Sequence, residues 1–331
     1  MNKLNIALMA GGDSSEREVS LGSAAQVYEA LDKAKYNVFL IDVLGRDWVW
    51  RDGKGGDWQV DRNDFSLTAN GRKTAFDYAL ILIHGTPGED GRLQGYFDFM
   101  GVPYSSCDMV SAVITFDKET CKRAVADADI NLAREVFIRR GERVDPAAIA
   151  AELGLPVFVK PNASGSSFGV TKVKRQEDIA AAVEAAFAES NEVLIEEFVA
   201  GREIACGVMV TRTGEEYVFP LTEIIPQNEF FDYEAKYTAG KSDEITPADI
   251  DEPTADRIRA MALRAYSACR CRGICRVDFI VRQDGEPVMI EINSVPGMSA
   301  GSIVPKQAAH AGMTLGELFD IVIGDTYTAE K

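Results

Sequence analysis

Four polar residues in the last quarter of the chain have types and a spacing that suit metal chemistry: Arg276, Asp278, Glu291 and Asn293. They lie in two segments, 275–282 and 287–293, which alternate apolar with polar residues and flank Asp284-Gly285. An Asp-Gly pair between such segments predicts a β-hairpin with a two-residue turn, in which Gln283 pairs with Glu286. Counted outward from that pair, the two acids lie opposite each other and the arginine lies opposite the asparagine.

The predicted hairpin places the four polar residues on one face, because side chains alternate between the two faces of a strand. Two carboxylates directly opposite each other repel, and a divalent cation between them removes that cost. Mg²⁺ takes carboxylate and amide oxygens together with oxygens of phosphate and water. A solvated face of an amphipathic hairpin fits the residues equally, so both interpretations stay open at this point. The opposite face is expected to join the core through Val277, Phe279, Val281, Val288, Ile290 and Ile292.

The elements that must position this hairpin indicate an α/β fold. The first hundred residues alternate strands with helix, which is typical of a parallel sheet. Ser15 and Glu18 form a candidate capping box for a helix that extends to about Leu31. A loop with His84 and three glycines directly follows a predicted strand, and strand ends of such sheets carry ligand loops. Strands are expected at residues 4–9, 38–43 and 78–83.

The character of the sequence changes near Cys107 and again near Ala200, so three domains are expected: 1–107, 108–199 and 200–331. In the second, Asp145 caps a helix that has Pro146 at its first position. A glycine- and serine-rich stretch, 162–169, follows a predicted strand there. Further helices are expected at residues 145–154, 178–187 and 254–269, and further strands at 157–160, 193–198, 204–210 and 217–225.

The polar segment 226–247 shows no clear periodicity. Loops longer than about 12–15 residues in a compact domain are usually functional or disordered, and this one is interpreted as a lid. A disordered insertion is the alternative. The aromatic residues clustered in the segment count against disorder.

Composition excludes some classes of partner and location. The chain has 331 residues with 52 acidic and 35 basic side chains, a net charge of −17, which argues against nucleic acid or an anionic membrane surface as partner. Six cysteines in a chain of this length do not suggest a disulfide framework, and Cys269, Cys271 and Cys275 lack the C-x-x-C spacing of zinc sites. Buried reduced thiols are therefore expected. The apolar run at the N-terminus is too short for a signal peptide or a membrane span, so a cytoplasmic location is expected.

Six sequence blocks follow one another along nearly the whole chain: residues 11–20, 84–91, 160–170, 231–237, 276–278 and 291–298. In this order they resemble the D-alanine–D-alanine ligase family of the ATP-grasp superfamily. The resemblance implies an α/β protein with an N-terminal parallel-sheet domain, a small central α+β domain that carries a glycine-rich loop, and a C-terminal α+β domain. It also implies an ATP-dependent carboxylate–amine ligase. One D-alanine is activated as an acyl phosphate, the amine of a second D-alanine attacks it, and D-alanyl-D-alanine, ADP and phosphate are released.

The resemblance assigns roles to residues around the reacting groups. Glu16 holds the ammonium group of the first D-alanine, and Ser166 and Tyr237 complete a hydrogen-bonded triad with it. Arg276 stabilises the tetrahedral intermediate, an electrostatic role like that of an oxyanion hole. His84 lies near the carboxylate of the first substrate, and Ser302 binds the carboxylate of the second.

The resemblance also assigns the binding of ATP and metal. Lys118 and Lys160 contact phosphates, Lys236 reaches the transferred group, and the loop with Ser166 offers backbone amides. Phe158, Phe198, Val199 and Ile290 wall the adenine pocket, and Glu196 and Glu203 accept hydrogen bonds from the adenine amine and ribose hydroxyls. Asp278, Glu291 and Asn293 hold two Mg²⁺ ions, which Mn²⁺ could replace.

Three other functions are considered for the chain. Tyr237 goes with D-alanine as second substrate in the family, whereas relatives that make D-alanyl-D-lactate carry histidine there. A ligase that uses D-serine or D-lactate second is therefore the nearest alternative. A nucleotide-binding regulatory protein without catalysis is expected to lack one of the four hairpin residues. A dinucleotide-dependent dehydrogenase lacks its fingerprint, because Gly11-Gly12-Asp13-Ser14 is not G-x-G-x-x-G. The resemblance places the enzyme in the cytoplasmic stage of bacterial peptidoglycan precursor synthesis, as a homodimer through its N-terminal domain.

Overall fold

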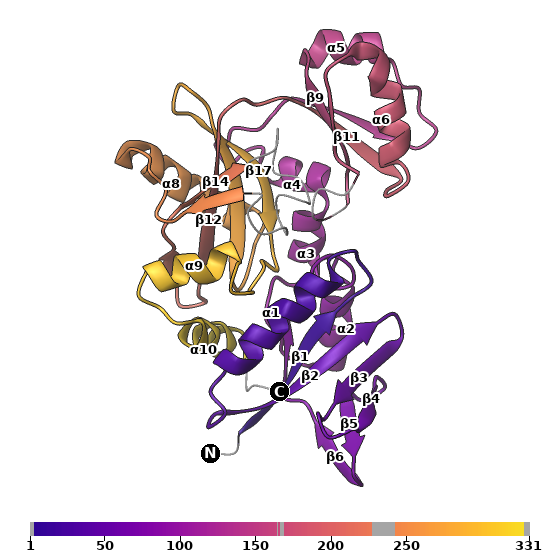
Figure 1. Cartoon of the computed structure of the whole chain (residues 1–331), viewed down its shortest axis with the longest axis vertical. Coiled ribbons are helices and arrows are strands. Elements are labelled where there is room, and N and C mark those ends of the chain that lie inside the picture. The colour runs from indigo at the N-terminus through magenta and orange to yellow at the C-terminus, as the bar shows by residue number, and fades with distance from the viewer. Residues whose placement is uncertain (1–2, 164, 166–168, 227–241, 328–331) are drawn as a thin grey trace.

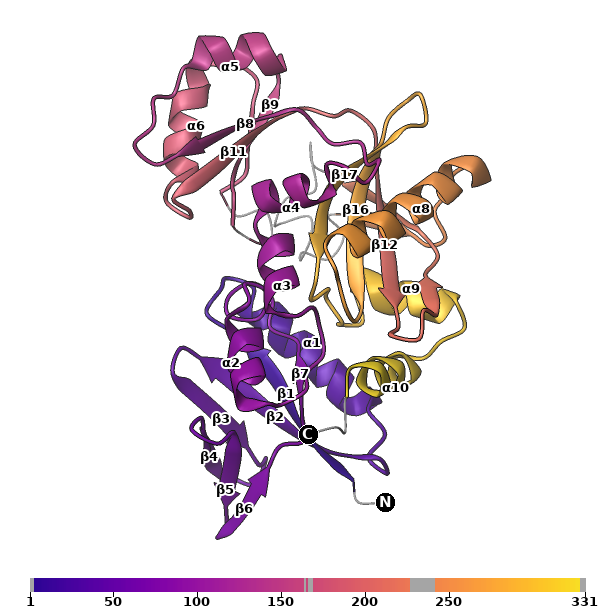
Figure 2. The same cartoon turned by 180° about the vertical axis from the view of Figure 1, so that it is seen from behind.

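Three β-sheets organise the chain in the computed structural model, which describes residues 3–163, 165, 169–226 and 242–327. The N-terminal sheet lies at one end of the long axis and a four-stranded sheet at the other (Figure 1). The sheet formed last along the chain lies between them, as the view from behind also shows (Figure 2). The middle sheet therefore has neighbours on both sides, and it carries the predicted hairpin.

The N-terminal sheet has seven strands in the order β6-β5-β4-β3-β2-β1-β7. The predicted parallel pairing is confirmed for β1 with β2 and with β7, whereas β3 to β6 extend the sheet in antiparallel fashion and were not predicted. Helices α1 (Arg17–Ala30) and α2 (Arg92–Met100) accompany this sheet. The strands are β1 (Leu4–Gly11), β2 (Tyr36–Leu44), β3 (Asp47–Arg51), β4 (Asp57–Asp61), β5 (Ser66–Ala69), β6 (Arg72–Ala75) and β7 (Tyr78–Ile81).

The predicted capping box at the start of α1 is wrong. The helix begins at Arg17 with Glu16 as its N-cap residue, and no side chain makes a capping hydrogen bond there. Ser14, not Ser15, bonds to the backbone: its hydroxyl accepts from Glu16 N over 3.2 Å and donates to His84 O over 2.8 Å. The serine therefore ties the helix entry to the loop after β7.

The four-stranded sheet is antiparallel, in the order β10-β9-β11-β8. Its helix α5 (Pro146–Leu153) confirms the predicted cap, because the Asp145 side chain accepts from Ala148 N. The other elements are β8 (Glu135–Arg139), β9 (Val157–Pro161), β10 (Thr171–Val173), the 3₁₀ turn η1 (Gln176–Asp178), α6 (Ile179–Ala186) and β11 (Glu192–Glu197). Strands β8 and β10 were not predicted.

The middle sheet runs β15-β14-β12-β16-β17, with β13 paired to β12. The single strand predicted at 217–225 is two strands, interrupted around Pro220. Of the predicted lid, residues 242–245 form β15 against β14, so this part is regular structure. Residues 227–241 of the lid lie outside the described residues. The strands are β12 (Arg202–Val210), β13 (Glu216–Val218), β14 (Thr222–Pro226), β15 (Ser242–Ile245), β16 (Cys275–Val281) and β17 (Pro287–Asn293).

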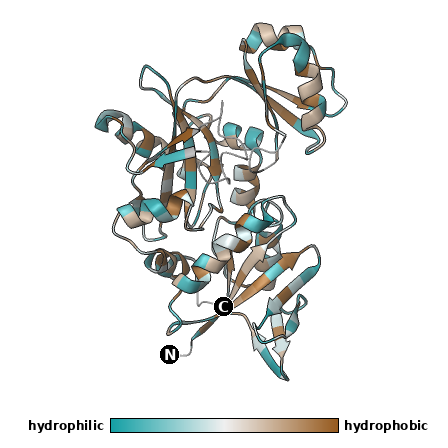
Figure 3. Cartoon of the chain, in the orientation of Figure 1, coloured by the Kyte–Doolittle hydropathy of each residue, from teal (hydrophilic) through white to brown (hydrophobic). Residues whose placement is uncertain are grey.

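Helices cover the middle sheet and connect it to the N-terminal one. Helix α8 (Glu252–Ala268) packs on β12, β16 and β17, and its N-cap Asp251 accepts from Thr254 N. Helices α3 (Met109–Phe116) and α4 (Lys118–Val125) pack against β17, and α9 (Ile303–His310) packs against β12. The covering helices carry both hydrophilic and hydrophobic stretches (Figure 3). None of the helices in the described part of the chain is long and apolar enough to cross a membrane.

The apolar cores do not follow chain order. Helix α10 (Leu315–Thr326) packs on α1, and Phe319 and Val322 share one core cluster with Ile6 and Val27. A second cluster joins side chains of α3 and α4 to the middle sheet and α8. The predicted domain boundaries stay predictions. This packing favours a central domain that begins near β8 instead of at residue 108.

Candidate active site

The hairpin of β16 and β17 brings the four predicted residues together. Asp278 lies opposite Glu291, and Arg276 lies opposite Asn293, as the sequence analysis predicted. Paired residues of an antiparallel ladder project from the same face. Asp278 is only 5% exposed, so this face is covered and is not a freely solvated surface.

The turn of the hairpin differs from the prediction. Arg282 N donates to Glu286 O over 3.0 Å, so the turn has three residues and the predicted two-residue turn is wrong. The register then shifts between Asp278 and Phe279, where Phe279 lies opposite Met289. One residue of β17, Ile290, is thus the extra residue of a β-bulge. Near the turn, the observed pairing differs by one residue from the predicted pairing. The extra residue of the bulge restores the predicted pairing, so Asp278 lies opposite Glu291.

The bulge also changes which side chains of β17 enter the core. Met289 is 2% exposed and joins the core cluster that contains Phe279 and Val277. Val288 and Ile290 were predicted for that face, but neither belongs to this cluster. Ile290 is half-buried, which leaves part of its side chain available to a ligand.

Each carboxylate on the polar face has a cationic neighbour. The Arg276 guanidinium donates through Nε to Asp278 Oδ1 over 2.8 Å and through Nη2 to Oδ2 over 2.7 Å. Asn293 Nδ2 donates to the same Oδ2 over 3.0 Å. Lys118 Nζ lies 3.7 Å from Glu291 Oε2. The two hydrogen bonds between Arg276 and Asp278 fix the relative orientation of the two side chains and also pair their charges.

A second charged cluster surrounds Glu196 on β11. Lys160 Nζ lies 2.5 Å from Glu196 Oε2, and Lys122 Nζ lies 2.9 Å from Oε1. Lys122 also pairs with Glu135. Burial raises the pKa of Glu196, but the two ammonium groups outweigh burial and hold this pKa below its usual range. Glu196 is therefore ionised at neutral pH and can accept hydrogen bonds.

Asn162 holds the two predicted phosphate-binding lysines in place. It follows β9, which carries Lys160, and its Oδ1 accepts from Glu119 N over 2.9 Å. Its backbone oxygen accepts from Lys118 N, the first residue of α4, over 3.3 Å. The start of α4 and the end of β9 are thereby fixed together.

The predicted adenine walls are not ordinary core residues. The rings of Phe158 and Phe198 have centroids 6.0 Å apart, and both side chains are half-buried. Phe158 lies opposite Glu196 in the β9–β11 ladder. Neither phenylalanine, nor Val199, belongs to any of the core clusters among the described residues. Glu203, the predicted ribose ligand, lies on β12 opposite Ile280 of β16.

Glu16 lies against Gly165, a described residue of the glycine- and serine-rich stretch. Glu16 is 7% exposed. A Cβ added to Gly165 would lie 2.2 Å from Glu16 Oε2. Only glycine allows this approach without displacing the carboxylate. The predicted partners Ser166 and Tyr237, together with Lys236, lie outside the described residues, so the triad stays a prediction.

Both ring nitrogens of His84 have partners within the protein. Nδ1 lies 2.8 Å from Val295 O, and Nε2 lies 3.3 Å from Ser23 Oγ. Ser23 Oγ also accepts from Met298 N over 3.0 Å. Burial lowers the pKa of His84, so the ring is neutral, with Nδ1–H donating and Nε2 accepting. His84 thus joins the loop after β7 to the segment after β17, and its predicted contact with substrate stays a prediction.

Glu89 was missed by the sequence analysis. Its Oε2 accepts from Gly85 N over 2.7 Å and its Oε1 accepts from Val295 N over 3.3 Å, which connects the same two segments. Burial, followed by the charge of Glu16, raises the pKa of Glu89 to about 8. The signal was an acid five residues after His84 in a glycine-rich block. Lys122 was also missed, although it lies four residues after Lys118 and therefore on the same side of α4.

Ser302, predicted to bind the second substrate, precedes α9 as its N-cap residue. Its Oγ accepts from Ser299 N over 3.0 Å and lies 2.8 Å from Ser299 Oγ. A Cβ added to Gly297 would lie 2.8 Å from this hydroxyl. The serine is therefore in a tight turn after β17, on the segment to which His84 and Glu89 bond.

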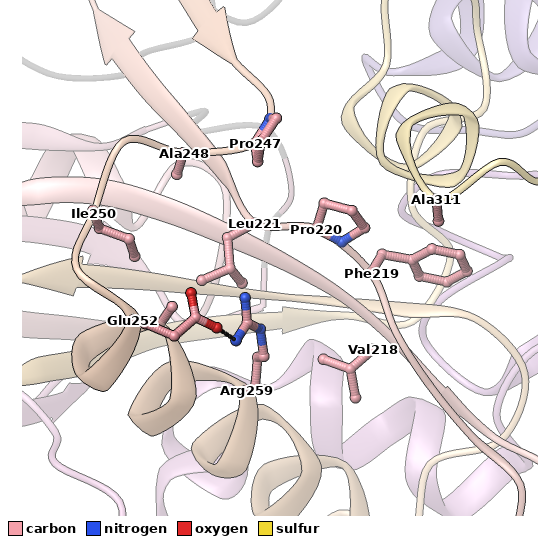
Figure 4. Close-up of a pocket in the computed structure, with 11 residues that line it drawn as sticks. Val218, Phe219, Pro220, Leu221, Pro247, Ala248, Ile250, Glu252, Arg259 and Ala311 are labelled. Carbon is pink, nitrogen blue, oxygen red and sulfur yellow. Dashed lines mark hydrogen bonds and ion pairs between the residues drawn. The ribbon is translucent and has the colours of Figure 1, made fainter.

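A cavity of about 620 Å³ lies elsewhere, beside α8 and the segment that joins β13 to β14 (Figure 4). An ion pair of 2.6 Å between Glu252 and Arg259 forms part of its wall. None of its lining residues is a predicted site residue. The charge clusters described above, and not this cavity, therefore define the candidate active site.

Comparison with known proteins supports the same interpretation. The family model for the N-terminus of D-ala D-ala ligase matches residues 5–107, and that for its C-terminus matches residues 124–324. A D-alanine–D-alanine ligase of Phocaeicola vulgatus is 46% identical over 325 residues, covering 98% of this chain and all of the relative. One of Flavobacterium johnsoniae is 45% identical over 315 residues, covering 95% and 97%.

Solved structures show the fold. The VanG D-Ala:D-Ser ligase of Enterococcus faecalis has a TM-score of 0.85 and 31% identity, covering 99% of this chain and 100% of that chain. D-alanyl-alanine synthetase A of Vibrio cholerae has a TM-score of 0.89 and 29% identity, covering 99% of both chains. The expected multi-domain α/β ATP-grasp architecture is confirmed. By its family models and its relatives over nearly the full length, the chain belongs to the D-alanine–D-alanine ligase family.

Proposed function

We propose that this chain uses ATP to join two D-alanine molecules into D-alanyl-D-alanine, with release of ADP and phosphate. The observation that supports this most directly is the face of the β16–β17 hairpin. Two facing acids, an amide and an arginine lie there, with Lys118 of α4 close by. A ligase of this type must gather charge around phosphates and then stabilise a negative intermediate. This face offers groups for both tasks.

The donor set of this face fits magnesium. Asp278, Glu291 and Asn293 supply two carboxylates and an amide, the hard oxygen donors that Mg²⁺ prefers. The carboxylates are paired with Arg276 and Lys118, and this pairing with positive charge supports the proposal. Two Mg²⁺ ions, or Mn²⁺, would be held there and would screen the repulsion between the phosphates and the carboxylates. This metal assignment is part of the proposal.

The lysines would orient ATP. Lys118 and Lys160 lie at the start of α4 and near the end of β9, which Asn162 joins, and this closeness supports a shared contact with one triphosphate. Phosphoryl transfer depends mainly on positioning and charge neutralisation, so cations fixed in this way contribute directly. Half-buried Phe158, Phe198 and Ile290 would contact adenine. Ionised Glu196 would accept from its amine.

The remaining residues would act on the amino acids. Glu16 would hold the ammonium of the first D-alanine while that substrate's carboxylate attacks the γ-phosphorus of ATP. The amine of the second D-alanine, with its carboxylate near Ser302, would then attack the acyl carbon. Arg276 would stabilise the oxyanion that forms, and phosphate would leave as the C–O bond breaks.

The second substrate is the finer part of the proposal. One structural relative is named as a D-Ala:D-Ser ligase, so the same scaffold serves a different second substrate. Tyr237, which lies outside the described residues, supports D-alanine by the family resemblance. A D-serine or D-lactate specificity is the alternative.

Product analysis tests the proposal. Purified protein with ATP and Mg²⁺ is given D-alanine alone, D-alanine with D-serine, D-alanine with D-lactate, or L-alanine, while ADP release and the product are followed. We expect one ADP per D-alanyl-D-alanine and little turnover of L-alanine. Faster formation of the D-lactate ester than of the dipeptide at neutral pH would contradict the proposed substrate. ADP release without any ligated product would contradict the proposed reaction.

A homodimer through the N-terminal part is also proposed. Phe99 of α2 is 88% exposed, and Met109, Val110 and Val113 of α3 are between 44% and 46% exposed. The two helices touch, since a Cβ on Gly95 would lie 3.0 Å from Met109 Sδ. Neighbouring apolar side chains left exposed in this way are typical of a subunit interface. Action in peptidoglycan precursor synthesis in the cytoplasm follows from the proposed product.

A further inference from the structure

Three of the six buried cysteines lie close together between the N-terminal part and the middle sheet. Cys107 precedes α3, whereas Cys271 and Cys275 flank the turn that joins α8 to β16. The three sulfur atoms all lie within 4.8 Å of one another, and the Sγ atoms of Cys107 and Cys275 are 3.9 Å apart. No other set of three His, Cys, Asp or Glu side chains in the described ranges is grouped in this way.

The turn that presents these thiols is held firmly. Gly273 has a positive φ of 65°, and a Cβ there would lie 3.2 Å from Ser106 N, so only glycine lets the turn reach residue 106. The buried Tyr266 hydroxyl donates to Gly273 O over 2.8 Å. Arg272 N donates to Cys107 Sγ over 3.5 Å. The sulfur positions are therefore fixed by backbone contacts before any ligand arrives.

The spacing matches a three-coordinate thiolate site. Thiolates bind Zn²⁺-sized cations at about 2.3 Å, so three of them around one ion lie about 4 Å apart. The sulfurs here need to move by less than about 1 Å to reach that arrangement. Cys121 and Cys269 form only a pair, with sulfurs 4.0 Å apart.

We propose that Cys107, Cys271 and Cys275 form a binding site for one thiophilic metal cation, separate from the oxygen-lined face of the hairpin. Soft thiolates select cations such as Cu⁺ and Zn²⁺ and discriminate against Mg²⁺. Each thiol that binds the cation releases its proton to solvent, and no redox change is needed. The bound cation would fasten residue 107 to the turn directly before Arg276. The site does not depend on the proposed ligase activity.

Cadmium is a suitable probe, because thiolate-to-metal charge transfer gives it an ultraviolet absorption band. The full-length protein, reduced and free of reductant, is titrated with Cd²⁺ in the presence of excess Mg²⁺. We expect the band to saturate at one Cd²⁺ per chain. The Cys107→Ser and Cys271→Ser variants are expected to bind at least about 100-fold more weakly. Cys206→Ser is the matched control, since Cys206 is equally buried but lies outside the group.

Two further measurements keep the proposal falsifiable if a variant folds poorly. In the unsubstituted protein, Cd²⁺ should raise the thermal midpoint. Because all six thiols are buried, a thiol reagent reaches them only when the structure opens, and Cd²⁺ should slow that reaction for three of the six. Zn²⁺ or Cu⁺ should displace Cd²⁺, and which of them does so identifies the class of cation. No saturable band, an equal band in Cys271→Ser, or retention of Cd²⁺ against both competitors would overturn the proposal.

Discussion

The side chain of Asp278, a proposed metal ligand, is held by two neighbours. The fork of Arg276 and the amide of Asn293 both donate to its carboxylate, so its oxygens are oriented although it is almost fully buried. Donors on both oxygens fix the orientation of a carboxylate as well as satisfying its hydrogen bonds. The partners therefore hold both oxygens of Asp278 in defined positions.

Replacing Glu291 with glutamine should weaken metal binding more than folding. The side chain is 24% exposed and keeps its shape, but one of two facing charges is lost. We expect the Mg²⁺ concentration for half-maximal rate to rise about tenfold or more, with the thermal midpoint little changed. Initial rates over a Mg²⁺ series check this. Glu286→Gln, an exposed position on the same hairpin, is the control, and an equal effect there would contradict the assignment.

Glu89 should make folding depend on pH. Its pKa in the folded state is about 8, against 4.5 for the unperturbed side chain. Between these values the folded protein keeps a proton that the unfolded chain loses, so folding becomes less favourable as the pH rises through this window. Glu89→Gln cannot lose that proton. Its thermal midpoint relative to the parent protein should therefore increase from pH 5 to pH 8 and then level off.

The control for this experiment is Glu184→Gln, since Glu184 is exposed on α6. Parallel pH profiles for the parent protein and Glu89→Gln would show that the carboxylate does not titrate in this window. Glu89→Gln also tests whether this side chain affects turnover, because Glu89 joins the loop after β7 to the segment after β17.

Residue types and alternation were sufficient to predict that four polar residues share one face of the hairpin, but not which other residues connect the segments of the candidate site. Arg276, Asp278, Glu291 and Asn293 could be grouped because pairing across a hairpin is a local count. Glu89 and Lys122 act across segments that only the tertiary fold brings together, as in the contact between Glu89 and Val295. The expected buried reduced thiols are confirmed, since all six cysteines are free and buried. The grouping of Cys107 with Cys271, 164 residues later, could not be predicted for the same reason.

At the scale of elements, Gly165 lies against Glu16, the N-cap residue of α1. Strands with strong alternation were predicted well, whereas the short antiparallel strands β3 to β6 and β8 were not, because their pattern is weak and their partners supply the stability. The loop itself was recognised by composition. Its contact with Glu16 could not be, since it depends on how two distant segments pack.

Gly165→Ala should impair the reaction without unfolding the protein. The added methyl group would lie 2.2 Å from Glu16 Oε2, so either the loop or the carboxylate must move. We expect kcat/KM for D-alanine to fall about tenfold or more, because misplacing a binding group by about 1 Å is costly. Steady-state kinetics check this.

Gly22→Ala serves as the comparison for that variant. It lies in α1 with nothing within 4 Å of the added Cβ, and alanine favours helix by about 0.5–1 kcal/mol. It should raise stability and leave kinetics unchanged. Unchanged kinetics in Gly165→Ala would contradict the proposed closeness of loop and substrate.

At the scale of the whole molecule, the first and last segments of the chain share a core. Phe319 and Val322 of α10 pack with Ile6 and Val27. A helix near the C-terminus therefore contributes to the core of the N-terminal sheet. The changes in sequence character near Cys107 and Ala200 predicted three domains. They could not predict that α10 packs against the N-terminal part, because an apolar helix carries no signal of which sheet it will cover.

Phe99→Asp should weaken self-association. The side chain is 88% exposed in the single chain, and a charge there would have to be desolvated in an interface. We expect the dissociation constant of the dimer to rise at least about tenfold, measured by sedimentation equilibrium. Leu155→Asp, at a 43% exposed leucine beside the four-stranded sheet, should leave it unchanged. A protein that is monomeric without substitution would contradict the proposed dimer.

The bulge at Ile290 lets two residues of β17 that are two positions apart face opposite sides of the sheet. Met289 enters the core, whereas Glu291 lies opposite Asp278. In a regular strand, residues two positions apart share a face. Deleting Ile290 makes these two residues neighbours, so the deletion variant should keep Glu291 opposite Asp278 and retain metal-dependent turnover. Homologues without the bulge are therefore expected to be one residue shorter at this place in the strand.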